Sequence, residues 1–382
     1  MTQERYLNNL TTLFDDLMTL CESTESFYYV DQTFLNNTYR VFSYRLASFT
    51  DFQHKNATEC RGHTFLKTDN GWELVSLPMQ KFWNWEEHLG WGEEIDLSGD
   101  IMIMDKLDGS LISTVYHDHN NPFPVLKSKT SFGSQQAQES TFWLSEQRGS
   151  KFFDAIQELI YDGRYTVNME YTSPSNIIVL RYSEPKLTVL NARSLDDGHY
   201  MSYSDLIHHF GEENVVRTYE ISGDRHHFIS NVRNMEDDIE GFVVKNDSGK
   251  WFKLKTKKYS DLHKICSSIQ NDRNLFEACV NEVADDVRAM FVNTPHYQRI
   301  VDMEEKVSKI YNHIHKSVYD FYNENKHLDR KSYAILGMER LNGEGTFSLA
   351  MNLYLGKDCD INGFMIKHYR DYGISDEQES VE

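Results

Sequence analysis

The chain has 382 residues, of which 13% are aromatic and 6 are proline, and this composition excludes an intrinsically disordered protein. Disordered chains lack the apolar and aromatic surface that offsets the entropy lost on ordering. The net charge of -20 argues against a protein that coats nucleic acid without specificity, because such binding depends on lysines and arginines that displace counterions. Any contact with nucleic acid must therefore be a local basic groove.

Apolar runs, cysteine spacing and chain length predict where the protein is located and how many domains it has. The segment from Met1 to Ser23 lacks the features of a signal peptide, and nowhere do about 18 apolar residues run together, so we expect a soluble protein with no membrane segment. The five cysteines are never spaced Cys-x-x-Cys, which argues against disulfides and a zinc site and fits a reducing cytoplasm. A single core stops growing near about 250–300 residues, so we expect two domains.

The chain opens with a predicted amphipathic helix, because Leu10, Leu13, Leu17 and Leu20 follow a helical stripe. From Tyr39 to about Thr256, β-branched and aromatic runs separated by turn residues predict strands. These runs are YRVFSYRL, HTFLK, WELVSL, IMIM, SLISTVY, PVLKSK, YTVNMEY, NIIVLRY, KLTVLNA, EGFVVK and WFKLK, with a helix expected near residues 151–161. The pattern is typical of an α+β domain built largely of antiparallel sheet.

Beyond Lys258, helical spacing replaces the strand pattern. The longest stripe steps by three and four residues through Ile300, Met303, Val307, Ile310, Ile314, Val318 and Phe321. We therefore expect the C-terminal part to be an all-helical domain. Residues 371–382 carry five carboxylates and no lysine or arginine, so we expect them to form a disordered acidic tail.

The segment Lys106-Leu107-Asp108-Gly109 is a candidate catalytic motif, because it lies directly between two predicted strands. A lysine held at a strand end can present its amine to a bound phosphate with little freedom left to lose. Free lysine has a pKa of about 10.4, and nearby cations or a metal ion favour the unprotonated amine that attack on phosphorus requires. On its own, the tetrapeptide is better explained as a hairpin turn beside a solvated lysine.

Further charges lie in strands where apolar or neutral residues would be usual. Lys253 and Lys255 alternate with apolar neighbours and so face one side of a strand, where an anion such as a triphosphate would relieve their repulsion. An exposed edge strand guarded by lysines would show the same pattern. Glu170 and Glu240 each lie in an apolar strand and need a hydroxyl, a lysine or a metal as partner, unless they face solvent. Arg61, Lys127 and Lys129 add cations in similar settings.

The order of these motifs along the chain resembles the covalent nucleotidyltransferase superfamily of ligases and capping enzymes, and within it the bacteriophage RNA ligase 1 family. The resemblance continues through residues 282–290 into the helical part, where DNA ligases and capping enzymes have a β-barrel instead. It is carried by RVFSYRLASF around Tyr44, ECRG around Arg61, PMQKFWN around Lys81, KLDGSL at Lys106, LKSK at Lys129, NMEY at Glu170, LNAR at Arg193, IEGFVV at Glu240 and FKLK ending at Lys255.

The resemblance implies a role for each of these residues. Lys106 would displace pyrophosphate from ATP and carry AMP, in a loop shaped by Asp108 and Gly109. Glu170 would hold the nucleoside, Glu240 would serve the metal ion, and Lys253 and Lys255 would hold the phosphates. The ATP site would be completed by Tyr44, Arg61 and Lys81, with Lys129 as a further candidate. Mg²⁺ is implied, with Mn²⁺ as a substitute, and Asp285 and Asp286 fall on a further metal position, although two aspartates in a helix are more often solvated surface.

The implied fold is an ATP-grasp-like nucleotidyltransferase domain over residues 1–260, an all-helical domain over 261–370 and the tail over 371–382. The implied reaction joins 5′-phosphate and 3′-hydroxyl RNA ends, with transfer RNA cut in its anticodon loop, or single-stranded RNA, as substrate. We expect a monomer in the cytoplasm, that of an infected host if the source is a phage. The chain departs from the family at Leu107 and Gln80, where acids are usual.

Two alternatives stay open at this point. The chain could be another member of the superfamily, either a DNA ligase or a capping enzyme that uses GTP. It could also be an inactive protein that binds RNA ends and has kept the fold. Retention of Lys106, Glu240, Lys253 and Lys255 together argues against the second alternative, because an inactive protein need not keep them.

Overall fold

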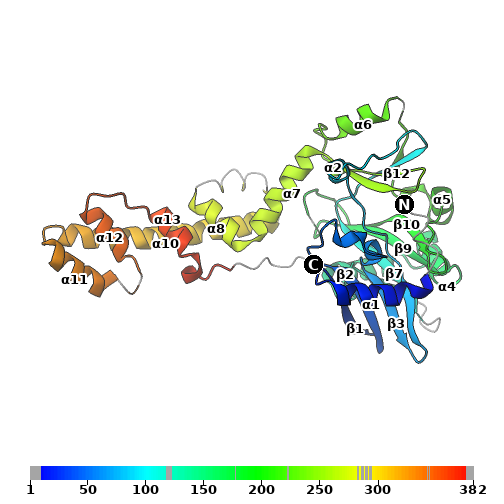
Figure 1. Cartoon of the computed structure of the whole chain (residues 1–382), viewed down its shortest axis with the longest axis horizontal. Helices are drawn as coiled ribbons and strands as arrows, with labels where there is room; N and C mark the ends of the chain where they lie inside the picture. Colours follow the sequence, from blue (N-terminus) through cyan, green and yellow to red (C-terminus); the bar gives the residue numbers. More distant parts are fainter. Residues whose placement is uncertain are drawn as a thin grey trace. The chain divides into compact units, whose positions relative to one another are not determined.

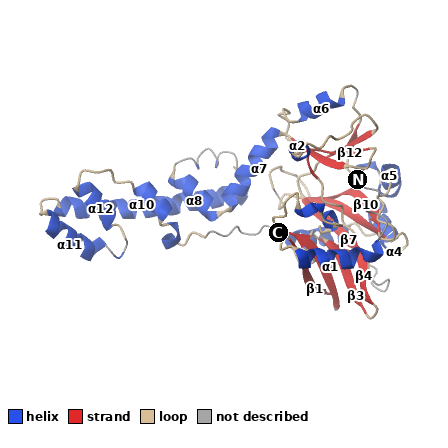
Figure 2. Cartoon of the chain, in the orientation of Figure 1, coloured by secondary structure: helices blue, strands red, loops and turns tan. Residues whose placement is uncertain are grey.

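The computed structural model describes residues 10–117, 123–176, 178–221, 223–281, 284, 288, 291, 295–341, 343 and 345–375. The chain divides into two compact units, Met1–Asp261 and Leu262–Glu382. Figure 1 follows the chain through both units, and Figure 2 shows strands in the first unit and helices in the second. None of the described helices is both long enough and apolar enough to cross a membrane.

The described strands of the first unit form three sheets, here named A, B and C. Sheet A has the order β1-β2-β3-β4, sheet B the order β11-β6-β12-β13-β5, and sheet C the order β10-β9-β7-β8. Neighbouring strands are antiparallel except for β13 and β5, which run parallel. The strands are β1 (Phe27–Phe34), β2 (Asn37–Tyr44), β3 (His63–Thr68), β4 (Gly71–Ser76), β5 (Trp83–Asn84), β6 (Ile101–Asp105), β7 (Ser110–Val115), β8 (Val125–Lys127), β9 (Tyr165–Thr172), β10 (Lys186–Ser194), β11 (Thr218–Tyr219), β12 (Gly241–Asn246) and β13 (Trp251–Lys255).

Short helices connect and cover these sheets. They are α1 (Leu13–Ser23), α2 (Trp85–Gly90), α3 (Gln135–Glu146), α4 (Lys151–Tyr161), α5 (Tyr203–Phe210) and α6 (Arg225–Val232), together with the 3-10 turns η2 (Leu10–Thr12), η3 (Asp51–Gln53), η4 (Ala57–Glu59) and η5 (Glu212–Asn214). Several begin at a serine whose hydroxyl group accepts a backbone N–H bond, as Ser150 does for α4.

Apolar side chains hold these layers together. Leucines of α1, including Leu17, pack against the phenylalanines of sheet A. Helices α4 and α5 cover one face of sheet C, where Ile156 is fully buried. Met104 of β6 and Trp251 of β13 belong to that same cluster, so one face of sheet B is turned toward sheet C. The other face of sheet B packs against α6. The prediction of an α+β fold with antiparallel sheets is confirmed.

The expected strand at residues 176–182 is wrong, because residues 178–182 form bends and loop. In sheet C, the strand that pairs with this edge of β9 is β10. The backbone N–H groups of Val179 and Leu180 donate instead to the carboxylate of Asp108. Strand β1 was not anticipated, because its run FYYVDQTF interrupts apolar residues with polar ones.

The second unit is helical throughout its described residues. Its elements are α7 (Lys257–Gln270), which begins in the first unit, and α8 (Asp272–Val280), α10 (Pro295–Asn325), α11 (Arg330–Leu341), α12 (Phe347–Tyr354), α13 (Ile361–Lys367) and η7 (Tyr369–Tyr372). The predicted stripe lies on α10, and six of its seven residues are buried: Ile300, Met303, Val307, Ile314, Val318 and Phe321.

The expectation of a disordered tail from residue 371 needs correction. Residues 371–375 are described, η7 ends at Tyr372, and Ile374 is buried with an exposed fraction of 4%. An apolar anchor orders this stretch despite its acidic composition. Residues 376–382 lie outside the described part of the chain.

Candidate active site

Lys106 lies where the chain leaves sheet B at the end of β6 and enters sheet C at the start of β7. Its backbone N–H donates to the carbonyl oxygen of Gly241, which opens the neighbouring strand β12. Its Nζ lies 2.8 Å from Oε1 of Glu240, a carboxylate with an exposed side-chain fraction of 3%. The lysine is therefore held at both ends, by its backbone and by its amine.

A second lysine shares the same carboxylate oxygen. Nζ of Lys255 lies 2.9 Å from Oε1 of Glu240. Lys253 lies two residues earlier on β13, on the same face of the strand. Burial, together with the positive charges of Lys81, Arg61, Lys106 and Lys255, lowers the pKa of Lys253 to about 6. A cluster of cations around one buried carboxylate is poised for a polyanion, whose charge would relieve the repulsion.

Arg61 and Lys81 belong to this cluster. Arg61 follows η4, and one of its guanidinium nitrogens, Nη1, donates to the carbonyl oxygen of Met79 at 3.4 Å. Lys81 precedes β5, and burial lowers its pKa against the opposing effect of Glu87, with further lowering by the charges of Arg61 and Lys255. Both residues are near enough to β13 for their charges to lower the pKa of Lys253.

Glu170 faces the same charges from β9 of sheet C. Burial raises its pKa to about 7 despite the opposing charge of Lys106, and the charge of Glu240 adds to the increase. Its Oε1 accepts a bond of 3.2 Å from the backbone N–H of Gly109. Gly109 has to be glycine for a steric reason, because a Cβ there would overlap the carbonyl oxygen of Tyr171.

Asp108 holds the loop of Lys106 in place. It is buried, and its Oδ2 accepts bonds from the backbone N–H groups of Val179 at 2.8 Å and Leu180 at 2.6 Å. Its Oδ1 accepts a bond of 2.7 Å from the hydroxyl group of Tyr259 on α7. These contacts assign Asp108 a positioning task.

Tyr44 and Lys129 lie together, since Nζ of Lys129 stands 4.6 Å from the centre of the Tyr44 ring. Lys127, which sequence reasoning left as one more cation, is fully buried. Its ammonium donates to the carbonyl oxygens of Gly62, Ser128 and Lys129, and burial with the nearby charge of Arg61 lowers its pKa to about 7. Lys127 thus ties the turn after Arg61 to the backbone of Lys129.

A cavity of 370 Å³ lies between sheets B and C. Met104 precedes Lys106 by two residues, and Trp251 precedes Lys253 by two, so the cavity continues the face that carries the lysines. It is lined by Met102, Met104, Leu190, Asn191, Tyr200, Met201, Ser202, Tyr203, Leu206, Lys245 and Trp251. Its largely apolar walls suit a flat heterocycle.

Carboxylates that could hold a divalent cation are few here. Glu240 is near enough for its charge to raise the pKa of Glu170. No group of three or more His, Cys, Asp or Glu residues suited to a metal occurs among the described residues. Two carboxylates fit an ion such as Mg²⁺, which takes one or two protein oxygens and completes its shell with water and phosphate. Asp285 and Asp286 lie outside the described residues.

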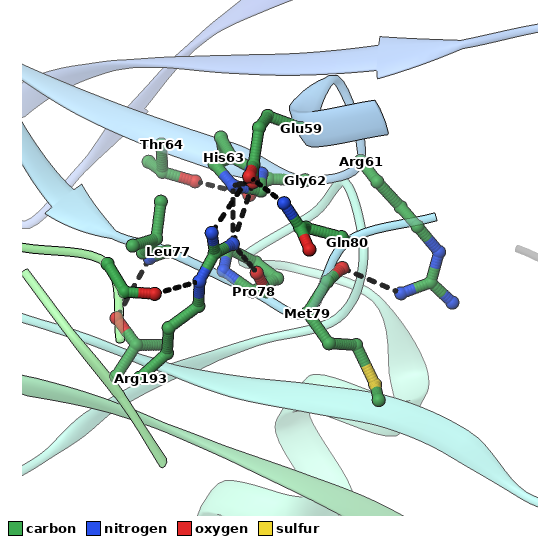
Figure 3. Close-up of polar contacts among 12 residues, drawn as sticks. Glu59, Arg61, Gly62, His63, Thr64, Leu77, Pro78, Met79, Gln80 and Arg193 are labelled. Atoms are coloured by element: carbon green, nitrogen blue, oxygen red, sulfur yellow. Dashed lines mark hydrogen bonds and ion pairs between the residues drawn. The ribbon is translucent and has the colours of Figure 1, made fainter. Parts of the chain in front are cut away.

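A buried network beside Arg61 was not predicted from the sequence (Figure 3). Glu59 forms an ion pair with Arg193, and His63 and Gln80 bind the same carboxylate. The segments ECRG and LNAR contain this pair, but they lie 134 residues apart, so only the folded chain shows that they meet.

Two family models together cover most of the chain. Residues 59–260 match the model described as RNA ligase. Residues 266–375 match the model described as T4 RNA ligase 1, C-terminal domain.

Individual proteins similar to this chain are also described as RNA ligases. A protein of Thermovibrio ammonificans described as an RNA ligase is 26% identical over 294 residues, which are 70% of this chain and 74% of that protein. RNA ligase 1 of Bacteriophage TS2126 is 26% identical over 219 residues, 54% of this chain and 51% of that protein, so the match spans about half of the phage enzyme. A solved RNA ligase of Naegleria gruberi reaches a TM-score of only 0.37 at 14% identity, over 50% of this chain and 60% of that chain, which is too low to support an inference.

The predicted resemblance to phage RNA ligases is therefore confirmed, since the first model alone spans more than half of the chain. The cluster of Lys106, Glu240, Lys253 and Lys255 lies within the residues that this model matches. The chain belongs to the RNA ligase family, which it matches over residues 59–260 and again over the largely helical residues 266–375.

Proposed function

We propose that this protein is an ATP-dependent RNA ligase whose Lys106 carries AMP. The observation that carries the proposal is the shared oxygen of Glu240, which binds the amines of Lys106 and Lys255 at 2.8 and 2.9 Å. A lysine placed among cations at the junction of two sheets suits attack on a phosphate better than a solvated hairpin lysine would. Lys106 is 20% exposed, so its amine is accessible to a nucleotide but restricted in direction.

In the first step, the unprotonated amine of Lys106 attacks the α-phosphorus of ATP. A P–N bond forms, the P–O bond to the β-phosphate breaks, and pyrophosphate leaves with the bonding electrons. Lys253, Lys255, Arg61 and Lys81 are the cations of this chain that would receive the charge that develops on the phosphates. The amine proton must leave before attack, and Glu240 is the carboxylate in contact with that amine.

Two exchanges at phosphorus complete the reaction. An oxygen of the RNA 5′-phosphate attacks the AMP phosphorus, the P–N bond breaks, and Lys106 regains its proton. The RNA 3′-hydroxyl then attacks the activated 5′-phosphate, a phosphodiester forms, and AMP leaves. Positioning accounts for most of the rate increase in such transfers, because the attacking and leaving oxygens have to stay in line.

The adenine ring would occupy the cavity between sheets B and C, with Met104 and Leu190 among its walls. Glu170 would hold the nucleoside from sheet C, while Tyr44 and Lys129 would flank the phosphates. Glu240 would hold Mg²⁺, for which Mn²⁺ could substitute, and the bound ion would neutralise triphosphate charge. Asp285 and Asp286 stay predictions for a further metal position.

For the RNA substrate, we propose single-stranded or broken ends, with transfer RNA cut in its anticodon loop as the natural case. Residues 1–260 would then form the adenylyltransferase domain, and the helical unit would provide the preference for transfer RNA. We also propose that the protein is a monomer and works in the cytoplasm. Sealing rates for cut transfer RNA and for an unstructured oligonucleotide, with and without residues 262–382, test the preference.

The test of the reaction is incubation with α-labelled ATP and magnesium. The wild type should retain covalent label after denaturation, Lys106→Ala should retain none, and the exposed-lysine control Lys67→Ala should label normally. An unlabelled wild type, or undiminished label in Lys106→Ala, would overturn the proposal. Labelling by GTP in place of ATP, or faster sealing of nicked duplex DNA than of RNA, would favour a capping enzyme or a DNA ligase.

A further inference from the structure

A buried carboxylate, that of Glu59, has every acceptor position occupied. Its Oε2 accepts bonds from Nη1 of Arg193 and from Nε2 of His63, each at 2.7 Å. Its Oε1 accepts from Nη2 of Arg193 at 2.8 Å and from the side-chain amide of Gln80. The four residues are at most 5% exposed. Because a carboxylate offers about four lone-pair positions, this one is saturated.

The network has only one formal ion pair. Burial alone would raise the pKa of Glu59, but the charge and hydrogen bonds of Arg193 and His63 outweigh it and hold that pKa well below its usual range. Burial lowers the pKa of His63 to about 4 despite Glu59, helped by the charges of Arg193 and Lys127. His63 is thus neutral near pH 7, and the charges of Glu59 and Arg193 balance each other.

Arg61 is tied to this network through its backbone. Its N–H donates to the carbonyl oxygen of Glu59 at 2.7 Å. Figure 3 shows the side chains diverging, with Glu59 directed at Arg193 and Arg61 extending away from the network. A fixed Glu59 therefore sets the point from which the Arg61 side chain departs.

Lys81 is tied to it by three contacts. Its N–H donates to the carbonyl oxygen of Thr58, next to Glu59, at 2.9 Å. The preceding residue, Gln80, binds the Glu59 carboxylate directly. Nη1 of Arg193 also donates to the carbonyl oxygen of Pro78 at 3.1 Å. Arg193, anchored in β10, thus joins the segment that carries Arg61 to the segment that carries Lys81.

Such a scaffold has a physical purpose. The charge of Arg61 is near enough to lower the pKa of Lys81, so the two cations repel each other when no anion lies between them. Some other group must therefore keep Arg61 and Lys81 close to each other. A buried ion pair adds little net stability, but it can fix geometry where its hydrogen-bond donors are directional. The guanidinium group of Arg193 binds the carboxylate through two parallel bonds, which sets orientation as well as distance.

We propose that Glu59, Arg193 and Gln80 form a buried positioning device that sets the spacing of Arg61 and Lys81, and thereby holds the nucleotide phosphates in line with Lys106. The inference rests on the proposed function, in which Arg61 and Lys81 bind those phosphates. It assigns these residues to phosphate binding and leaves recognition of the nucleoside to the cavity between sheets B and C.

The test compares a ligand that has phosphates with one that has none. The double variant Glu59→Gln with Arg193→Met removes both charges, so that no buried charge is left without its partner. Arg193→Lys keeps the charge, loses the two parallel bonds, and serves as the milder variant should the double variant fold poorly. Dissociation constants are measured for the α,β-methylene analogue of ATP, which cannot transfer AMP, and for adenosine. Labelling by α-labelled ATP gives the rate of the first step.

The dissociation constant for the analogue should rise about tenfold to hundredfold in the double variant, the range for a lost charge-assisted phosphate contact, and less in Arg193→Lys. Adenosine affinity should fall by less than the affinity for the analogue, because Arg193 reaches the cavity only through Tyr200, whose ring centre lies 5.1 Å from the guanidinium carbon. Val232→Ala, in the core between α6 and the face of sheet B that does not line the cavity, is the control for lost stability and should change neither constant. Unchanged affinity for the analogue in both variants, or an equal loss for both ligands, would overturn the inference. An unlabelled wild type would overturn the proposed function itself, and this inference with it.

Discussion

The hydroxyl group of Tyr259 donates a hydrogen bond of 2.7 Å to Oδ1 of Asp108, although 151 positions separate the two residues in the sequence. Oδ2 of Asp108 is engaged by the backbone N–H groups of Val179 and Leu180. The loop that carries Lys106 is thus anchored from two segments far along the chain. Its shape depends on the start of α7 as well as on the sheets.

Removing one anchor should loosen the lysine without unfolding the protein. Tyr259→Phe deletes the hydroxyl group and leaves Asp108 with its two backbone donors. We expect a loss of about 1–2 kcal/mol in the free energy of unfolding, because one buried bond to a charged group is lost. Labelling of Lys106 should slow by about tenfold, the equivalent of about 1.4 kcal/mol. Single-turnover labelling and urea titration measure the two effects. Wild-type labelling in Tyr259→Phe would show that this anchor is not needed.

Gly109 is constrained by its neighbour. A Cβ in Gly109→Ala would overlap the carbonyl oxygen of Tyr171, where β7 pairs with β9. Because backbone cannot retreat as a flexible side chain does, we expect a loss of about 1–3 kcal/mol in the free energy of unfolding.

Gly133→Ala is the matched control, since an added Cβ there meets nothing within 4 Å. Denaturant titration of the two variants should separate them clearly. Equal midpoints would mean that the strands can move apart at little cost.

Lys253 should lower the stability of the protein when no nucleotide is bound. Its folded pKa of about 6 lies below its ordinary value of 10.5, so between these pH values the unfolded chain binds more protons. Stability due to this residue therefore rises with pH across that window. Lys253→Met should raise the melting temperature by a few degrees, about 2–4 °C, at pH 7 while abolishing AMP transfer. Scanning calorimetry at pH 7 and pH 10 should show the gain shrinking at the higher pH.

The contribution of Glu170 to stability should depend on pH with the opposite sign to that of Lys253. Its folded pKa of about 7 lies above its ordinary value of 4.5, so the folded state holds the proton more tightly across that interval. Stability due to protonated Glu170 is fully present below pH 4.5 and is lost as the pH rises toward 7. The groups that face it are Lys106, Glu240, Arg61 and the N–H of Gly109.

Glu170→Gln keeps a neutral side chain at every pH and should remove this dependence. Relative to wild type, the variant should gain about 1–3 kcal/mol of stability between pH 4.5 and pH 7. Urea midpoints measured at half-unit steps provide the comparison. Parallel curves for the two proteins would mean that Glu170 is ionised throughout.

Gln80→Glu would place a second carboxylate against Glu59. Arg193 can balance only one of the two charges, so the folded state should keep an extra proton on a carboxylate or on His63. The groups that face this position are Glu59, Arg193, His63 and Tyr200, with Lys127 near His63. A pKa raised by folding gives stability that is lost as the pH rises, so the variant should weaken relative to wild type above about pH 4.5. Thermal melts from pH 4 to pH 8 measure this, and identical pH profiles would contradict it.

Short-range patterns in the sequence determined much of this protein. Alternation along β13 predicted that Lys253 and Lys255 share a face, and the spacing from Ile300 to Phe321 predicted the buried stripe of α10. The motif order also led to the correct family. The alternation and the stripe depend on neighbours within a few residues, where strand and helix geometry fix the direction of each side chain.

Only the tertiary structure decided which distant residues meet. Nothing local indicates that Arg193 reaches Glu59, or that the carboxylate of Asp108 is turned inward toward Val179 and Leu180. The apolar run at residues 176–182 is typical of a strand, yet its described residues 178–182 form bends and loop, where two backbone N–H groups bind a buried carboxylate. The free energy of a buried charge depends on which partners surround it, and those partners are assembled only when the sheets pack.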